Sequence, residues 1–181
     1  MAQVMNAVRM MLTAHEPFPA IALDRAWNIA MSNRAFDRLG AMLGDDVWRR
    51  VGGAQRNLMR LFFHPDGIRP LITNWATVGP LTWRRAQKEA EALGGQEMQA
   101  VLADLAPYQD AEVLWSAADT DLMPVLPFNM RANGLEISMF AIVATFGTAQ
   151  DVTADELRIE TLCPADAQTE ALFKMAAASA S

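Results

Sequence analysis

Two apolar runs joined by Asn133-Gly134 constrain the fold of this chain more than any other feature. Residues 125–131 and 135–146 are rich in β-branched and aromatic side chains, which favour strands. Asn-Gly between two such runs is typical of a tight β-hairpin, because both residues readily adopt a positive φ. Residues 156–163 alternate apolar and polar side chains, which indicates a half-buried strand. The C-terminal part of the chain therefore predicts three antiparallel strands.

A second set of strands is expected near the N-terminus, and helices fill the middle of the chain. Apolar runs at 20–23 and 28–31 flank a turn led by Asp24, whose carboxylate can accept backbone hydrogen bonds, so they predict a second hairpin. Between the two sets, apolar periodicity indicates several helices, with Gly79-Pro80 expected to break the chain between two of them. The predicted helices span residues 57–63, 68–78, 81–93, 96–105 and 110–118. This order predicts an α+β fold, with one antiparallel sheet of about five strands and helices packed over one face.

The N-terminal segment and the helix caps suggest how the chain is organised. Residues 3–14 place apolar side chains at helical spacing and polar ones on the other side, which predicts an amphipathic helix. Ser32 or Asn33, Asn57 and Asp166 precede helical patterns and can accept hydrogen bonds from the first free N–H groups. We therefore divide the chain into three parts: an N-terminal linker helix at 1–16, one domain at 17–175 and a disordered tail at 176–181.

The strand at 135–146 carries apolar residues on both of its faces. One face is apolar throughout, while the other begins with Glu136 and Ser138 and then continues with Phe140 and Ile142. A strand with one solvated face should alternate to its end, so the second face is expected to be covered over much of its length. The N-terminal helix or a partner subunit could provide this cover, and we expect a homodimer.

Charge and cysteine content restrict the partners and the compartment. The formal net charge is -6, and an acidic domain repels phosphate groups, so this chain by itself is a poor candidate for binding DNA or an anionic membrane. Cys163 is the single cysteine and cannot form an internal disulfide. No segment approaches the roughly 18 consecutive apolar residues of a membrane span. We expect a cytoplasmic domain that does not bind a membrane.

The sequence contains no recognisable motif for catalysis, a metal or a cofactor. His15 and His64 each stand alone, without the neighbouring ligands of a metal site. No serine lies in a G-x-S-x-G turn, and no Gly-rich phosphate loop follows a strand. We expect no catalytic residues and no cofactor. The chain is rich in methionine and tryptophan, with 12 and 5 residues, and such side chains either fill a core or line an apolar cavity.

Several stretches of the chain resemble a known family. Residues 20–44 look like the opening of a PAS domain, with a strand, an Asp-led turn, a strand ending in Asn and a helix ending in Gly. The sequence from about residue 3 to about residue 173 resembles the C-terminal ligand-binding domain of MmyB-like transcription regulators. The most specific blocks are Arg56-Asn57-Leu58…Phe62-Phe63 and Thr145-Phe146-Gly147…Asp151-Val152-Thr153…Glu156-Leu157.

The resemblance implies a function and a partner domain. It implies a PAS-like sheet with helices over it, enclosing an apolar pocket for a fatty-acid-like or other small hydrophobic ligand. It also implies a helix-turn-helix domain of the XRE family on the N-terminal side. The chain begins directly before the linker helix, so DNA binding is expected only through such a domain, which this sequence does not include. We expect a non-enzymatic sensory domain of a bacterial transcription regulator.

The expected pocket combines large apolar side chains with two polar residues for a ligand head group, Asn129 and Arg131. The apolar candidates are Phe62, Phe63, Trp75 and Trp115 from the helices, and Phe128, Met130, Met139 and Val143 from the strands. Two alternatives stay open. A small α+β enzyme acting on a hydrophobic substrate would need convergent titratable groups in the cavity, whereas a ligand-free dimerisation module would have its interior filled by side chains.

Overall fold

The computed structural model describes residues 2–44, 46–93, 95–109, 125–145 and 157–179, and these form an α+β fold. Five strands make one sheet in the order β2-β1-β5-β4-β3, and every neighbouring pair is antiparallel. The strands are β1 Ala20–Leu23, β2 Ile29–Ser32, β3 Phe128–Ala132, β4 Leu135–Thr145 and β5 Arg158–Pro164. The predicted fold class, a PAS-like antiparallel sheet with helices, is confirmed.

Both predicted hairpins are present, and the chain uses residue chemistry to form each turn. Asn133 and Gly134 have φ values of 51° and 78°, so the β3–β4 turn uses the left-handed geometry that Asn-Gly favours. In the β1–β2 turn, Asp24 Oδ1 accepts hydrogen bonds from the backbone N–H groups of Ala26 and Asn28, each at 2.9 Å. These local hydrogen bonds fix where each strand starts and ends.

The C-terminal strand β5 lies in the middle of the sheet and joins its two halves. Thr161 pairs with Ala20 of β1 on one side and with Ile142 of β4 on the other. Sequence alternation predicts one solvated face for this strand, but Ile159 and Glu160 are both buried although they point to opposite faces. A central strand is covered on both sides, and this position in the sheet overrides the amphipathic pattern.

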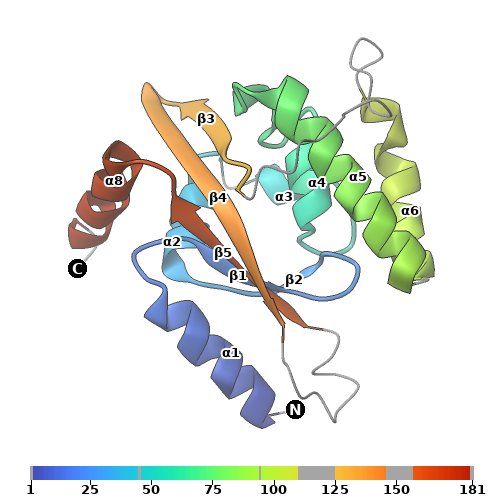
Figure 1. Cartoon of the computed structure of the whole chain (residues 1–181), viewed down its shortest axis with the longest axis horizontal. Coiled ribbons are helices and arrows are strands. Elements are labelled where there is room, and N and C mark those ends of the chain that lie inside the picture. The colour runs from blue at the N-terminus through green and yellow to red at the C-terminus, as the bar shows by residue number, and fades with distance from the viewer. Residues whose placement is uncertain (1, 45, 94, 110–124, 146–156, 180–181) are drawn as a thin grey trace.

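Helices cover both faces of the sheet, and most of them lie on one side (Figure 1). The helices are α1 Ala2–Ala14, α2 Arg34–Ala41, α3 Val47–Arg50, α4 Leu58–Phe63, α5 Trp75–Leu93, α6 Gln96–Leu105 and α8 Ala167–Ala178, with short 3₁₀ turns η1 Arg69–Leu71 and η2 Ala106–Tyr108. Val8 and Leu12 of α1 pack against Ala20, Ala22 and Ile159 on one face. Helices α2 to α6 stand on the side of the opposite face, which carries Leu162 and Glu160.

The helical middle differs from the sequence prediction around Gly79-Pro80. Helix α5 runs through both residues without a break. Of the predicted helix at 68–78, residues 75–78 belong to α5, whereas residues 69–71 form the turn η1 and Ile72 forms a bridge with Met130. Gly79 and Pro80 are buried, and a Cβ added at Gly79 would lie 2.9 Å from the Trp75 ring. The ring therefore packs directly over the glycine, and this packing holds the helix together where proline removes one backbone donor.

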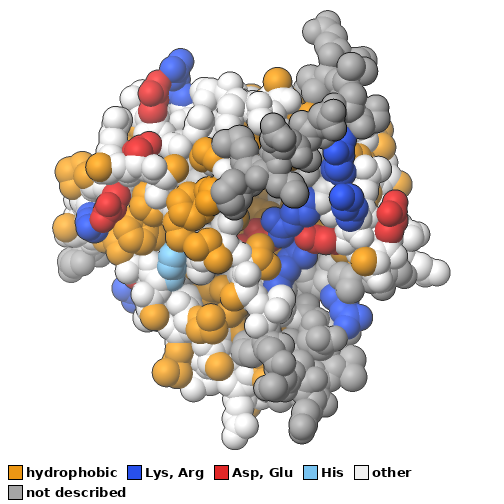
Figure 2. Space-filling model, in the orientation of Figure 1, with side chains coloured by type: hydrophobic (Ala, Val, Ile, Leu, Met, Phe, Trp, Pro, Cys, Tyr) orange, Lys and Arg blue, Asp and Glu red, His pale blue; other side chains and the backbone are white. Residues whose placement is uncertain are grey.

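Two expectations from the sequence need correction: one concerns the end of helix α8, and the other the cover over strand β4. Helix α8 runs to Ala178, so residues 176–178, which the sequence predicts to be part of a disordered tail, are helical. The predicted cover over the second face of β4 is incomplete, because α1 packs on β1 and β5 while Ile142 is 51% exposed. Apolar side chains gather over α8 and β4 in Figure 2, and cover by a partner subunit stays a prediction.

Candidate ligand-binding cavity

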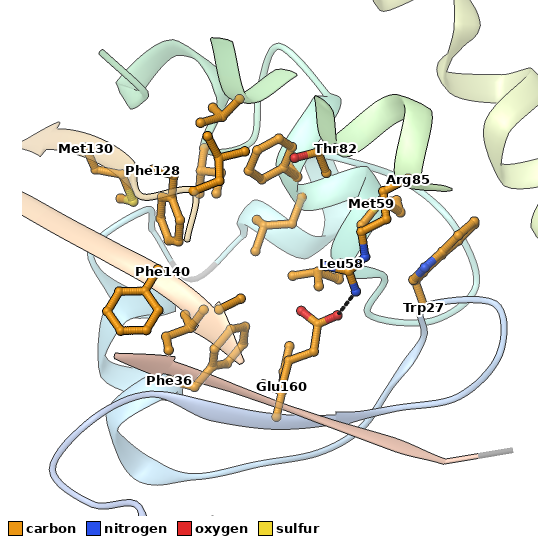
Figure 3. A pocket seen from close by; sticks show the side chains of 18 of the residues that line it. Trp27, Phe36, Leu58, Met59, Thr82, Arg85, Phe128, Met130, Phe140 and Glu160 are labelled. Carbon is orange, nitrogen blue, oxygen red and sulfur yellow. Dashed lines mark hydrogen bonds and ion pairs between the residues drawn. The ribbon is translucent and has the colours of Figure 1, made fainter. Parts of the chain in front are cut away.

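A cavity of about 670 Å³ lies between the sheet and the helices α2, α4 and α5. The sheet contributes Ile21 and Leu162 to its wall, and residues 125–130 close one side with Leu126 and Phe128. Figure 3 shows Phe36, Leu58, Met59 and Phe128 directed toward this space from different elements. The volume falls in the range of about 300–1,000 Å³ that is usual for small-molecule sites.

Helix α4 sorts its side chains between the cavity and the protein core. Asn57 caps the helix by accepting a hydrogen bond from the Arg60 N–H at 3.1 Å, which fixes where the helix begins. Leu58, Leu61 and Phe62 then follow helical spacing and line the cavity. Phe63 points to α5 and α6 instead, with its ring centroid 5.3 Å from that of Trp83.

The cavity has one polar wall, formed by Glu160 of β5 and Arg85 of α5. Arg85 Nη2 donates a hydrogen bond to Glu160 Oε1 at 3.2 Å. The side chain of Glu160 is only 8% exposed, whereas that of Arg85 is 47% exposed. A buried carboxylate is costly unless it is paired, so Arg85 makes the position of Glu160 tenable. Figure 3 shows this ion pair beside the apolar side chains.

Two further charges complete a network behind the polar wall. Glu89 accepts hydrogen bonds from Arg85 Nε at 2.8 Å, from Arg158 Nη1 at 2.7 Å and from Trp27 Nε1 at 3.0 Å. Arg158 Nε also lies 3.7 Å from Glu160 Oε1. Although partial desolvation opposes it, the carboxylates of Glu160 and Glu89 raise the pKa of Arg85. The network holds two positive and two negative groups in fixed places.

The sequence of the chain matches one family along almost its whole length. The model of the MmyB-like transcription regulator ligand binding domain matches residues 4–175. The chain belongs to this family. No curated protein sequence matches the chain. The resemblance stated from the sequence blocks is thus confirmed, and the family description makes this a ligand-binding domain of transcription regulators.

The MmyB-like domain brings three of the predicted pocket residues to the cavity: Phe62, Phe128 and Met130. Phe63 and Met139 are fully buried among core side chains and do not line it. Trp115 lies outside the described residues. Of the predicted residues, Phe62, Phe128 and Met130 therefore line the cavity, whereas Phe63 and Met139 belong to the core. The role of each in binding a ligand stays a prediction.

The other predicted pocket residues in the described part of the chain lie outside the cavity wall. Trp75 stacks against Phe62 at a centroid distance of 5.4 Å, and Val143 is exposed. Arg131 pairs with Glu136 on the surface. The Ser138 hydroxyl donates a hydrogen bond to Asn129 Oδ1 at 2.7 Å. The charged residues that the MmyB-like domain places at its cavity, within the described part of the chain, are Arg85 and Glu160.

Glu160 and Glu89 are not predicted as site residues from the sequence, because the local signals around them indicate solvated positions. Glu160 occupies a polar position in an alternating strand, which is typical of a solvated face. Glu89 lies close to Glu91 in a polar stretch, which is typical of a solvated helix face, yet Glu89 is half-buried between two arginines. The four-residue spacing of Arg85 and Glu89 is a pairing signal, and it is the one clue in the sequence to this network.

Glu89 is expected to make the domain more sensitive to acid. Partial desolvation would raise its pKa, but the guanidinium groups of Arg158 and Arg85 outweigh this and hold the pKa below the ordinary value of 4.5. A carboxylate whose pKa is lower in the folded than in the unfolded state stabilises the fold at pH values above its unfolded-state pKa. This contribution is lost as the pH falls through the folded-state pKa. Glu89→Gln should therefore cost about 1–2 kcal/mol at neutral pH.

The pH series that tests Glu89 uses urea unfolding of the wild-type domain and Glu89→Gln. The difference between their free energies of unfolding should shrink as the pH falls below 4.5. Glu89 then becomes protonated, first in the unfolded and next in the folded protein, and so loses the charge that distinguishes it from glutamine. A difference that stays constant across the series would contradict an ionic role for Glu89.

Proposed function

We propose that this domain senses a small hydrophobic, fatty-acid-like molecule by enclosing it in the cavity between the sheet and α4 and α5. The observation that carries the proposal is the cavity of about 670 Å³ with largely apolar walls and one polar wall. Such a site buries the chain of an amphiphile and orients its polar end. The family description, a ligand-binding domain of transcription regulators, supports the same function.

The arrangement of β5 supports a route from the cavity to the N-terminal helix. Glu160 and Leu162 line the cavity on one face of the strand, while Ile159 packs against Val8 and Leu12 of α1 on the other. A ligand that shifts β5 therefore also changes the contacts of α1. A ligand with different affinity for two packings of this strand shifts their populations, and α1 would pass the change to the DNA-binding part of the regulator.

The charges in the cavity favour sensing over catalysis. Among the described lining residues, the acidic and basic side chains are Glu160 and Arg85, which neutralise each other in an ion pair. Within the same described part of the chain, no three His, Cys, Asp or Glu side chains are grouped so that they could hold a metal ion. None of the described helices is long and apolar enough to cross a membrane.

Ligand binding is tested with purified domain and a variant that fills the cavity. We expect mass spectrometry of organic extracts to find a co-purified lipid, and a fluorescent apolar reporter to bind to the emptied protein. Thr82 lines the cavity from α5, so Thr82→Trp should weaken reporter binding by about tenfold or more, since the indole occupies the ligand's space.

The matched control for the cavity variant is Thr77→Trp on the same helix. Thr77 is exposed and lies outside the cavity wall, so this variant should bind the reporter as the wild type does. Equal binding by Thr82→Trp and the wild type, or reporter binding that no lipid displaces, would contradict the proposed function.

A further inference from the structure

One oxygen of the buried Glu160 carboxylate is left for a ligand. Its Oε1 accepts the hydrogen bond from Arg85 Nη2 and lies close to Arg158 Nε. Its Oε2 has no hydrogen-bond partner among the residues that the structure describes, since the contacts of this carboxylate with Arg85 and Arg158 all go to Oε1. Because Glu160 lines the cavity, Oε2 is an acceptor directed into that space, as Figure 3 shows.

Arg85 provides a donor next to this acceptor. Its Nε and Nη2 are used by Glu89 and Glu160, while Nη1 has no partner within the described ranges. Arg85 also lines the cavity. Because Arg85 and Glu160 are hydrogen-bonded to each other and both line the cavity, the polar wall places a guanidinium next to a carboxylate. A hydroxyl or an amide, which can both donate and accept, complements such a pair.

The charge balance of the network argues against an ionised head group. Arg85 and Arg158 are balanced by Glu89 and Glu160, so the site has no surplus positive charge. A ligand carboxylate placed here would add a third negative charge close to Glu160, and like charges at such distances repel strongly in a partly desolvated site.

We infer that the cavity selects an amphiphile with an uncharged head group that donates a hydrogen bond, such as an alcohol or an amide, over an ionised carboxylate. The head group donates to Glu160 Oε2 and accepts from Arg85 Nη1. This inference rests on the proposed function and narrows it: the apolar tail of the ligand is fatty-acid-like, while its head group is uncharged. It identifies Glu160 as the residue that determines specificity.

The selectivity is tested by displacing a fluorescent apolar reporter at about pH 8 with decan-1-ol and with decanoate. The wild-type domain should prefer the alcohol. In Glu160→Gln, which keeps the shape of the side chain and removes its charge, the ratio of the two dissociation constants should shift toward decanoate by about tenfold or more. Arg85→Gln should shift the same ratio in the opposite direction, because Glu160 then repels the anion with less compensation.

Decyl methyl ether tests the hydrogen bond itself. It can accept from Arg85 but cannot donate to Glu160, so it should displace the reporter from the wild-type domain less effectively than decan-1-ol, although it is the more apolar molecule. If the ether binds as tightly as the alcohol, the donor requirement is overturned.

The outcomes separate the selectivity from the proposed function. If both amphiphiles displace the reporter and neither variant changes their ratio, the role of Glu160 is overturned while ligand binding stands. If neither amphiphile displaces the reporter from the wild-type domain, the proposed function fails and this inference fails with it. Thermal unfolding checks that each variant is folded, and if Glu160→Gln does not fold, the opposite shift expected for the more exposed Arg85→Gln decides the question.

Discussion

Phe63→Ala is expected to destabilise the domain by about 3–5 kcal/mol, the usual cost of removing a buried phenyl ring. Phe63 is 1% exposed, and its ring centroid lies 5.1–5.6 Å from those of Phe62, Trp75 and Trp83. These rings join α4 to α5, so the truncation opens a void that close-packed neighbours refill only in part. Urea unfolding followed by tryptophan fluorescence measures the change.

The neighbouring residue Phe62 is the matched control for Phe63. It is half-buried and lines the cavity, so Phe62→Ala should cost only about 1–2 kcal/mol but should weaken binding of the apolar reporter. We assign Phe63 to the core and Phe62 to the cavity wall. A Phe63→Ala variant with wild-type stability and reduced reporter binding would contradict this assignment, and would place Phe63 in the pocket as the sequence predicts.

Asn33→Ala is expected to cost about 3 kcal/mol or more, because this buried side chain joins three elements. Its Oδ1 accepts from the N–H groups of Ala20 and Phe36, both at 3.0 Å, and its Nδ2 donates to the carbonyls of Leu12 and Phe18 at 3.2 and 2.8 Å. The substitution removes the cap of α2 and leaves buried polar groups of the backbone unpaired, at about 1–3 kcal/mol each.

Two further variants show which hydrogen bonds of Asn33 matter. Asn33→Asp keeps the acceptor that caps α2 but loses the donor, so its thermal unfolding midpoint should lie between those of the wild type and Asn33→Ala. Asn6→Ala changes an exposed asparagine of α1 and should alter stability by less than about 0.5 kcal/mol. If Asn33→Ala lowered the stability no more than Asn6→Ala, the hydrogen bonds of Asn33 would not contribute to the stability of the fold.

Features that depend on residues close together in the chain are predictable from the sequence. The Asn133-Gly134 turn and the caps at Asn33, Asn57 and Asp166 all occur as expected. Each rests on φ preferences or on a hydrogen bond spanning a few residues, so no distant partner is needed to form it. The number of strands followed from the same local signals.

Gly79-Pro80 shows where such signals fail. Both residues are typical of a helix break, and the sequence alone favours two helices. In the structure the Trp75 ring fills the space over Gly79, and burial of this turn outweighs the backbone donor that proline lacks. The same limit applies to Phe62 and Phe63, because which of two adjacent rings meets a cavity depends on how α4 is rotated against its neighbours.

The strands, the turns, the helix caps and the family can all be predicted from the amino-acid sequence. Tertiary structure alone decided that Glu160 lies in a cavity wall, because it brings Arg85 from 75 residues away to pair with it. The physical reason is that a turn or a cap gains its free energy from adjacent residues, whereas a carboxylate can be buried only when a distant cation is delivered to it by the packing of the whole fold.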